Sequence, residues 1–307
     1  MKFSERLRQW GMPSEALVIL NRPSADAPAH DPAAPPHHVA DAATPQLSAL
    51  DLAATRGDGI FETISVGFGH PQAFAHHLAR FARSARMLDL PAPDLDAWRA
   101  AVLAAIAELD PSEEAFVKIV LSRGIEGVDK PTGWAYASHS PDYSRARIDG
   151  LRVVTLDRGV RHDVERAAPW LLAGAKTLSY AVNRAVVREA ARREADEVVF
   201  VSSDGFLLEG PSSTLIYRRG DMLLTPGPGI GILDGTTQAN VFRYAESVGL
   251  ATSFEIAGLD ALRGADAAWL VSSVRLAAPI RAVDGVELAV DAELSAAINH
   301  YLRTLTE

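Results

Sequence analysis

The sequence predicts an α+β protein with two domains. Helix-like and strand-like runs do not alternate regularly along the chain, which argues against a repeated βαβ architecture. Several strand-like runs are joined in pairs by short turns that contain glycine, as at 203–205 and 219–221. The length of 307 residues is enough for two ordinary domains. Because Asp149-Gly150 precedes a new strand, we expect an N-terminal domain at 1–149 and a C-terminal domain at 150–307.

The composition is that of a soluble globular protein. Apolar residues make up 48% and charged residues 22% of the chain, and the net charge is −9. An acidic chain of this kind is not expected to bind nucleic acid or an anionic membrane nonspecifically. The absence of cysteine excludes disulfides, thiolate zinc sites and cysteine nucleophiles. Met1–Trp10 does not resemble a secretory signal, and no apolar run is long enough to span a membrane, so we expect a cytoplasmic protein.

The N-terminal half predicts a Pro-rich segment followed by strands and helices. Residues 22–46 are rich in Pro, Ala and Asp, and we expect a long loop or weakly ordered insertion there. Hydrophobic periodicity then predicts strands at 60–66 and 116–122 and helices at 76–88 and 96–109.

The C-terminal half predicts hairpins and two prominent helices. One helix is expected at 179–193, and the other runs from about Asp234 to Ser247, with Gly249 as its stop. The expected strands are 151–156, 197–201, a returning strand at 206–209, 214–217 and 222–224.

Several common site motifs are missing. The chain has no Gly-Lys-Ser/Thr of a phosphate-binding loop and no Gly-x-Ser-x-Gly of a serine hydrolase. Gly227–Asp234 has only part of a dinucleotide-binding pattern, because Asp234 stands where the third glycine belongs. His30, His37 and His38 lie in the Pro-rich segment without the framing of a metal site, and we expect no metal.

Three other features carry possible chemistry, each with an ordinary alternative. Lys176 lies among small and apolar neighbours, and a lysine kept from bulk water suits Schiff-base chemistry, although a solvated loop lysine is the commoner case. Glu209 ends a strand-like run and could cap the next turn or hold a protonated pyridine nitrogen. Thr236 and Thr237 begin a helix, where free N–H groups bind phosphates but also form ordinary N-caps.

These features occur in a fixed order with other motifs. The order is Arg-Gly-Asp-Gly-Ile-Phe-Glu-Thr at 56–63, His-Leu-Ala-Arg-Phe at 77–81, Lys-Thr-Leu-Ser-Tyr at 176–180, Asp-Glu at 196–197, Leu-Glu-Gly-Pro-Ser-Ser at 208–213, Leu-Thr-Pro at 224–226 and Gly-Ile-Leu-Asp-Gly-Thr-Thr at 231–237. The series resembles the class IV aminotransferases, the fold-type IV pyridoxal-phosphate enzymes, over nearly the whole chain except the Pro-rich segment. The resemblance implies a smaller N-terminal α/β domain and a larger C-terminal domain with hairpins and a barrel-like sheet.

The resemblance also implies pyridoxal 5′-phosphate as cofactor and assigns roles to residues. Lys176 would form a Schiff base with the cofactor and later carry the proton, and Glu209 would hold the pyridine nitrogen protonated. The phosphate and the ring face would be contacted by Arg80, Leu233, Thr236 and Thr237. Many relatives have a phosphate-binding threonine at about Val274, so we expect Ser272 or Ser273 to take its part.

Within the family, the chain is most similar to the aminodeoxychorismate lyases. It lacks the Gly-Asn-Tyr run of branched-chain aminotransferases and the Arg-x-His carboxylate trap of D-amino-acid transaminases, and it has Ser-Arg-Gly at 122–124. This similarity implies conversion of 4-amino-4-deoxychorismate to 4-aminobenzoate and pyruvate in folate biosynthesis. The alternatives are an aminotransferase acting on branched-chain or D-amino acids, and a noncatalytic family member.

The cofactor residues do not separate a lyase from a transaminase, because both reactions share the removal of a proton. The substrate pocket must separate them, and its candidate residues are Arg123, Lys130, Tyr180 and Arg275. For Arg275, a contact with a substrate carboxylate and a plain surface position are both open. The expected partners are a small-molecule amine as substrate and, from the family, a second copy of the chain in a homodimer.

Overall fold

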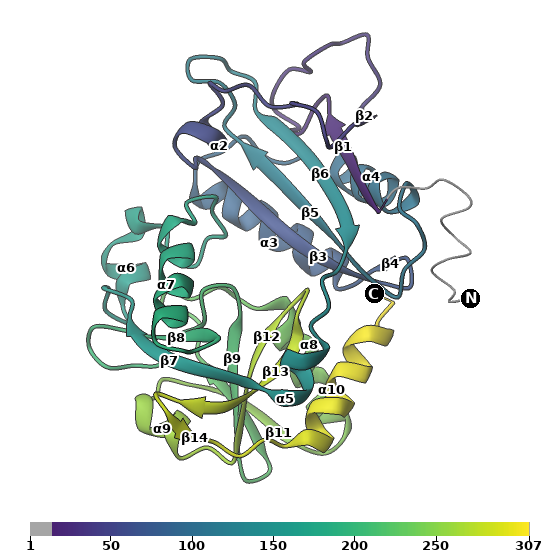
Figure 1. Ribbon diagram of the computed structural model, residues 1–307. Coiled ribbons are helices and arrows are strands. Elements are labelled where there is room, and N and C mark those ends of the chain that lie inside the picture. Colours follow the sequence, from purple (N-terminus) through teal and green to yellow (C-terminus); the bar gives the residue numbers. More distant parts are fainter. Residues whose placement is uncertain (1–13, 307) are drawn as a thin grey trace. The chain divides into compact units, whose positions relative to one another are not determined.

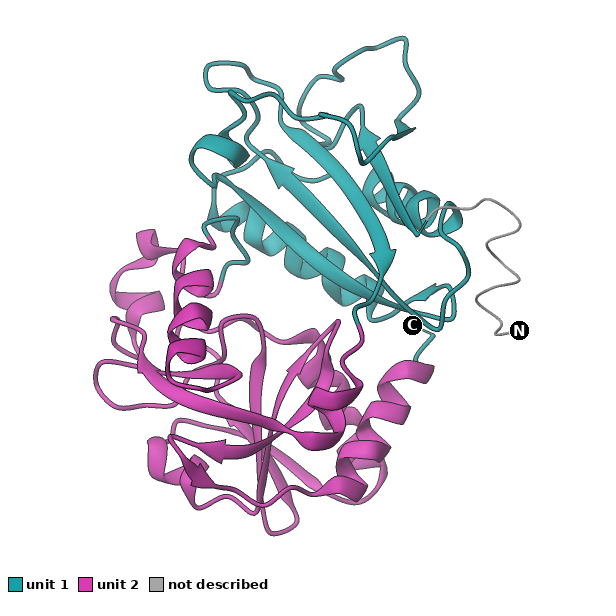
Figure 2. Cartoon of the chain, in the orientation of Figure 1, with its two compact units in different colours: residues 1–141, 175–179, 305–307 teal, residues 142–174, 180–304 magenta. Residues whose placement is uncertain are grey.

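The computed structural model describes residues 14–306, which form two compact units (Figure 2). Unit 1 runs to Pro141 and also includes Ala175–Ser179 and the chain from Leu305, while unit 2 comprises Asp142–Gly174 and Tyr180–Thr304. Compared with the expected boundary at 149/150, the first residues of unit 2 lie earlier, and a short segment of the C-terminal half joins unit 1. Met1–Trp10, considered above as a possible signal, lies outside the described residues.

Unit 1 is an antiparallel six-stranded sheet with the order β2-β1-β6-β5-β3-β4 (Figure 1). Its strands are β1 (Glu15–Leu20), β2 (His37–Ala40), β3 (Gly59–Gly67), β4 (His70–Pro71), β5 (Glu114–Ser122) and β6 (Thr132–His139). Its helices are α2 (Leu52–Thr55), α3 (Phe74–Met87) and α4 (Leu95–Ala107). Helix α3 packs against β3, and α4 packs against β1 and β6. The expected strands and helices of this half are confirmed, with ends shifted by a few residues.

The core of unit 1 follows from two periodic patterns. On β3, Ile60, Ile64 and Val66 alternate with less buried residues, as expected for a strand with one face on the core. On α4, Trp98 is fully buried and makes an edge contact with Phe81 of α3, with ring centroids 5.0 Å apart. The two helices therefore cover the same sheet and share one apolar layer with it.

The Pro-rich segment is more regular than expected. The prediction of a long loop or weakly ordered insertion at 22–46 is wrong in part, because the segment contains β2, which pairs antiparallel with β1. Asn21 ties it further, since its side chain donates to Asp31 O and accepts from the Asp31 N–H. The indole N–H of Trp98 donates to Pro23 O at 2.8 Å. Backbone and side-chain hydrogen bonds thus order a segment whose composition offers little to bury.

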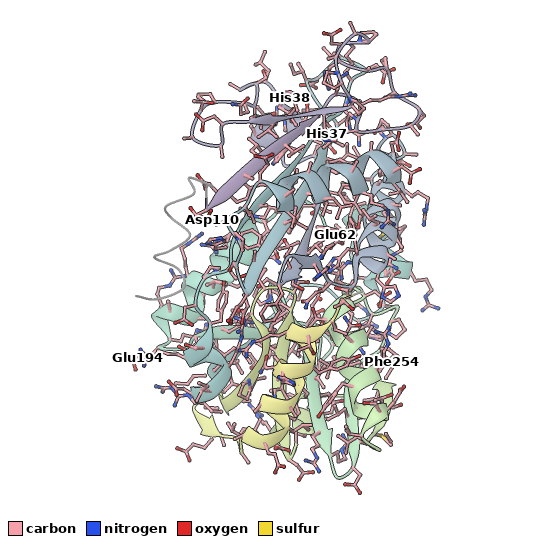
Figure 3. The ribbon with its side chains drawn as sticks, turned by 90° about the vertical axis from the view of Figure 1, so that its right-hand side faces the viewer. His37, His38, Glu62, Asp110, Glu194 and Phe254 are labelled. Atoms are coloured by element: carbon pink, nitrogen blue, oxygen red, sulfur yellow. The ribbon has the colours of Figure 1, made fainter. Side chains whose placement is uncertain are left out.

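The three histidines of this segment do not converge. His37 and His38 lie on β2, at the edge of the sheet (Figure 3). His30 contacts Pro131 O through Nε2 at 2.9 Å. Over residues 14–306, no group of three or more His, Cys, Asp or Glu side chains is arranged to hold a metal ion.

Unit 2 is built on a mixed eight-stranded sheet with the order β11-β10-β9-β12-β13-β7-β8, and β14 beside β13. Its strands are β7 (Leu151–Asp157), β8 (Glu197–Val201), β9 (Thr214–Arg219), β10 (Met222–Pro226), β11 (Ala251–Glu255), β12 (Ala267–Ser272), β13 (Leu276–Val283) and β14 (Val286–Glu287). Its helices are α5 (Ser144–Asp149), α6 (Val164–Ala167), the 3₁₀ turn η2 (Pro169–Leu171), α7 (Ala181–Arg192), α8 (Thr236–Ser247), α9 (Leu259–Arg263) and α10 (Ala292–Thr304). The α+β class is confirmed in both units.

The local predictions for unit 2 hold with one exception. The β9–β10 hairpin is confirmed, and Gly249 follows α8 with φ +86°, as a helix stop requires. The returning strand expected at 206–209 is wrong, because this stretch makes only isolated bridges. Phe200 N still donates to Glu209 O at 2.9 Å, so the turn returns the chain to β8 without forming a continuous strand. In the part of the chain that is described, no helix has the length and apolar character to cross a membrane.

Gly59 is required by close packing, and its replacement tests the sheet. A Cβ at this position would lie 2.6 Å from Leu121 O and 2.9 Å from Ser122 Cα, which are backbone atoms of the neighbouring strand. We expect Gly59→Ala to lower the free energy of unfolding by about 1–3 kcal/mol, the cost typical of overpacking. Urea denaturation checks this, with Gly227→Ala as control, since its Cβ would come only to 3.8 Å from Phe254 Cβ. Equal stabilities for the two variants would contradict the packing argument.

Candidate active site

Lys176 is held in unit 1 by main-chain hydrogen bonds. The Phe61 N–H donates to Lys176 O at 3.0 Å, and the Leu178 N–H donates to Gly59 O at 2.8 Å. The Lys176 N–H donates to the hydroxyl of Ser84, a buried residue of α3, at 3.1 Å. The segment Ala175–Ser179 therefore lies in extended form beside the start of β3, and both the strand and the helix hold the lysine backbone.

The side chain of Lys176 is partly buried. Its Nζ lies 4.6 Å from the centroid of the Phe61 ring, within the range of a cation–π contact. Phe61 and Lys176 come from opposite sides of the same short backbone pairing. The amine is thus positioned by an aromatic face rather than left in a solvated loop.

A buried ionic network lies on the core side of the same strand. Glu62 on β3 is fully buried and accepts hydrogen bonds from Nε and Nη2 of Arg80 at 2.7 and 2.6 Å (Figure 3). Since an ionised carboxylate only accepts, the Nδ1 of His77 donates to Glu62 at 2.7 Å. His77 and Arg80 stand three residues apart on α3 and so share one face of the helix.

The protonation states in this network follow from burial and charge. Burial disfavours the charged form of Glu62, but Arg80 and His77 outweigh it and hold the pKa of Glu62 well below its ordinary value of 4.5. Burial lowers the pKa of His77 below 6.5 despite its bond to Glu62, so the imidazole is neutral at pH 7. The network at neutral pH is one carboxylate, one guanidinium and one neutral imidazole.

The sequence analysis did not identify Glu62 or His77, although a signal was present. Glu62 stands in phase with Ile60 and Ile64 on the core face of β3, where a carboxylate needs a cationic partner. Arg80 was identified as a phosphate ligand, and the structure shows that Glu62 binds two of its nitrogens. An acidic residue in the apolar register of a strand is the readable signal for such a pair.

In unit 2, Glu209 and Leu233 are joined directly. The Leu233 N–H donates to Glu209 Oε1 at 3.1 Å, and both residues are partly buried. This bond connects the end of the turn after β8 to the run before α8. The sequence motifs that contain these two residues are therefore adjacent in the fold.

The N-terminus of α8 presents donors that no side chain caps. Its first residues, Thr236 and Thr237, are buried, and the preceding Gly235 makes no side-chain cap. A Cβ at Gly235 would lie 2.4 Å from Thr214 Oγ1, so only glycine allows this approach. The hydroxyl of the adjacent Ser213 is buried and has no partner within the described residues. A helix N-terminus beside such a hydroxyl suits an anion.

The turn between β12 and β13 carries Ser273 and Arg275 and is held under strain. Leu276, which closes it, is buried with φ +61°, a left-handed conformation that costs a branched residue energy. The buried Arg147 of α5 donates to Val274 O at 3.2 Å and to Arg275 O at 2.9 Å. Asn299 of α10 bonds both the N–H and the carbonyl of the next residue in β13. Two helices thus fix the backbone of the turn.

Tyr180 lies at the start of α7 and is fixed by its hydroxyl. The hydroxyl donates to Pro211 O at 2.8 Å. Burial, followed by the negative charges of Glu209 and Glu197, raises the pKa of Tyr180 to about 12. The phenol therefore stays protonated and remains a donor throughout the physiological range.

The other two substrate candidates make local contacts in unit 1. Arg123 binds Asp58 through Nε and Nη2 at 2.7 and 3.3 Å, and it donates to the carbonyls of Leu88 and Asp89 at the end of α3. Lys130 Nζ lies 3.4 Å from His30 O of the Pro-rich segment. These contacts favour a structural part for Arg123 and Lys130 rather than a substrate contact.

The donor set fits pyridoxal 5′-phosphate. Unit 1 holds the amine of Lys176, and unit 2 holds the carboxylate of Glu209, the apolar side chain of Leu233 and the N-terminus of α8. An amine, a carboxylate for a ring nitrogen, and N–H and hydroxyl donors for a phosphate are the groups that this cofactor requires. The unpartnered Ser213 hydroxyl marks a place where an acceptor is expected.

Removal of the Glu62 charge tests the buried network. We expect Glu62→Gln to lower the free energy of unfolding by about 3–5 kcal/mol at pH 7, because it leaves the charge of Arg80 buried without its partner. The pKa of Glu62 is lower in the folded chain than its ordinary value of 4.5. The ion pair therefore contributes fully above that pH and progressively less below it. Urea denaturation from pH 3 to 8 should show the difference between wild type and variant shrink below pH 4.5.

The exposed carboxylate of Glu113 in the same unit provides the control. Glu113→Gln should leave stability unchanged across the pH range. A Glu62→Gln protein as stable as this control would show that the buried pair contributes nothing.

Comparison with known proteins agrees with the fold and the donor set. The family described as "Amino-transferase class IV" matches residues 59–283. The bifunctional aminodeoxychorismate lyase/D-amino acid transaminase of Mycobacterium tuberculosis is 46% identical over 256 residues, which cover 80% of this chain and 88% of that protein.

Solved structures show the same similarity over nearly the whole chain. A fold IV-transaminase from Curtobacterium pusillum is 51% identical with a TM-score of 0.90, covering 95% of this chain and 98% of that one. A hypothetical aminotransferase from Mycobacterium tuberculosis in its PLP-bound form is 40% identical with a TM-score of 0.85, covering 94% and 99%. The chain therefore belongs to the class IV aminotransferase family and is a fold-type IV enzyme that depends on pyridoxal 5′-phosphate.

Proposed function

We propose that this enzyme is an aminodeoxychorismate lyase, which converts 4-amino-4-deoxychorismate to 4-aminobenzoate and pyruvate. The observation that carries the proposal is the fixed position of Lys176, whose backbone is bonded to β3 and α3 and whose amine lies against Phe61. Such an amine can accept and return a proton at one defined place. The choice of substrate is supported by the 46% identical relative, whose name includes this activity.

Each proposed residue has one task. When bound, pyridoxal 5′-phosphate supplies an aldehyde that captures amines and a ring that spreads negative charge. Lys176 binds it and then takes the proton from the amine-bearing ring carbon of the substrate. Glu209 keeps the pyridine nitrogen protonated, and the Leu233 N–H orients the Glu209 carboxylate. Loss of the neighbouring ether oxygen from the substrate is driven by formation of the aromatic ring.

The phosphate is assigned to donors of both units. In unit 2, the N–H groups of Thr236 and Thr237 and the hydroxyl of Ser273 act as neutral donors. In unit 1, Arg80 supplies a positive charge whose orientation is set by Glu62. A guanidinium held by a carboxylate loses less side-chain entropy when it binds an anion.

A second activity, D-amino-acid transamination, is proposed for the same residues. It is supported by the bifunctional name of the 46% identical relative and by the 51% identical transaminase. The two activities share the proton removal by Lys176 and differ in where the proton returns. We further propose that the enzyme works as a homodimer, which light scattering on the purified protein measures directly.

Lys176 can be tested by chemical trapping. We expect the purified protein to be yellow, and borohydride reduction should attach the mass of the cofactor to the peptide that contains Lys176. Lys176→Ala should show no attachment and should lose activity by about 10²–10⁴-fold, as expected for a lost proton-transfer group. Lys118→Ala, at an exposed position of β5, is the matched control and should resemble wild type. Protein that stays colourless with added pyridoxal phosphate would contradict the assignment.

The reaction outcome is tested by single-turnover mixing. With aminodeoxychorismate and no keto acid, the lyase should release 4-aminobenzoate. With D-alanine, the transaminase activity should convert the cofactor to its pyridoxamine form, while L-leucine should do so much more slowly. If D-alanine and L-leucine react but aminodeoxychorismate yields no 4-aminobenzoate, the lyase assignment is wrong.

A further inference from the structure

Arg275 is a partly satisfied arginine in the interior of unit 2. Its side chain is 14% exposed, and its Nη1 donates to Glu197 Oε2 at 2.9 Å. Its other two nitrogens, Nε and Nη2, are buried and have no hydrogen-bond partner within the described residues. Buried donors on a charged group are costly when left unpaired, so an acceptor is expected beside them.

The two unpartnered nitrogens belong to the same edge of the guanidinium. Nε–H and one N–H of Nη2 point in parallel, and this is the edge that binds the two oxygens of a carboxylate or phosphate in bidentate fashion. The bond to Glu197 engages the remaining nitrogen, Nη1. Glu197 therefore holds the guanidinium in one orientation and leaves the bidentate edge available.

The backbone that carries Arg275 is preorganised. The turn is closed by Leu276 in a left-handed conformation, and Arg147 binds the carbonyls of Val274 and Arg275. Strain of this kind persists only where the surroundings enforce it, and it concentrates at ligand-binding sites. A rigid turn lowers the entropy that an arginine loses when it binds an anion.

Arg275 lies close to residues already assigned to the active site. Tyr180 is under the electrostatic influence of both Glu209 and Glu197, so the two carboxylates flank its phenol. Arg275 in turn is bonded to Glu197. These contacts, all within unit 2, connect the proposed anion-binding edge to the carboxylate that is proposed to hold the pyridine nitrogen.

We propose that Nε and Nη2 of Arg275 bind a carboxylate of the substrate, and that Glu197 is the positioning residue for this contact. The inference rests on the proposed function, because aminodeoxychorismate and D-amino acids both carry carboxylates. A monoanionic carboxylate is favoured over a phosphate dianion on charge. Arg275 is already neutralised by Glu197, and Glu209 lies nearby, so a dianion would meet more repulsion at this place.

The experiment is a calorimetric titration of the yellow holoenzyme with glutarate, a dicarboxylate that has no amine and does not react. Arg275→Lys keeps the charge but loses the bidentate edge, and we expect it to raise the Kd for glutarate at least tenfold. Glu197→Gln removes the compensating charge beside Arg275, and we expect it to lower the Kd at least threefold. Arg281→Lys, at an exposed position of the same strand, is the matched control and should bind glutarate as wild type does.

A purely structural role for Arg275 predicts a different result. It would lower the Tm of both Arg275→Lys and Glu197→Gln without shifting glutarate affinity in opposite directions, and this outcome overturns the proposal. If Arg275→Lys folds poorly, the tighter binding expected of Glu197→Gln remains a test on its own, and unchanged or weaker binding overturns the proposal.

A second titration separates substrate carboxylate from cofactor phosphate. Apo protein is titrated with pyridoxal 5′-phosphate and with pyridoxal, which lacks the phosphate. Equal effects of Arg275→Lys on the two ligands support the carboxylate, whereas a loss confined to the phosphorylated ligand overturns it. If glutarate binding depends on Arg275 but aminodeoxychorismate is not converted, the carboxylate site stands and the lyase assignment alone fails.

Discussion

The backbone pairing of Ala175–Ser179 with β3 is the constraint on which the proposed chemistry depends. Two N–H···O bonds and a third bond from Ser84 fix the main chain at Lys176, although the chain on both sides of this segment belongs to unit 2. The lysine side chain is long and flexible, so its amine can serve at one defined place only if its backbone does not move. Gly59 is part of this constraint, since a side chain there would meet the backbone of β5 and the side chain of Leu178.

A second theme is the buried carboxylate that orients an arginine. Glu62 does this for Arg80 in unit 1, and Glu197 does it for Arg275 in unit 2. A buried ion pair contributes little net stability, because desolvation of both charges offsets their attraction. Its benefit here is geometric: each carboxylate binds part of the guanidinium and determines where the rest points. The arginines are then ready to bind an anion without first losing their rotamer freedom.

The local structure of this chain could be predicted from local patterns. Periodic apolar residues located α3, α4, α7 and α8, and glycine turns located the β9–β10 hairpin. The failures came from interactions between distant residues. The Pro-rich segment gained β2 because β1 supplies it with hydrogen bonds, and the stretch after β8 paired too sparsely to become a strand. Neither outcome is visible in a window of ten residues, because the partner strand lies outside it.

The sequence by itself determined the family, the cofactor and the identity of the central residues, because Lys176, Glu209 and the Thr236-Thr237 helix start stand in an ordered series of motifs. Only the tertiary structure decided what surrounds them. Glu62 pairs with an arginine on another element, and Glu197 pairs with one 78 positions away. Arg123, a substrate candidate by sequence, instead binds Asp58 and the end of α3. The physical reason is that a charged side chain acts through its nearest partner and its burial, and both are set by how distant elements pack.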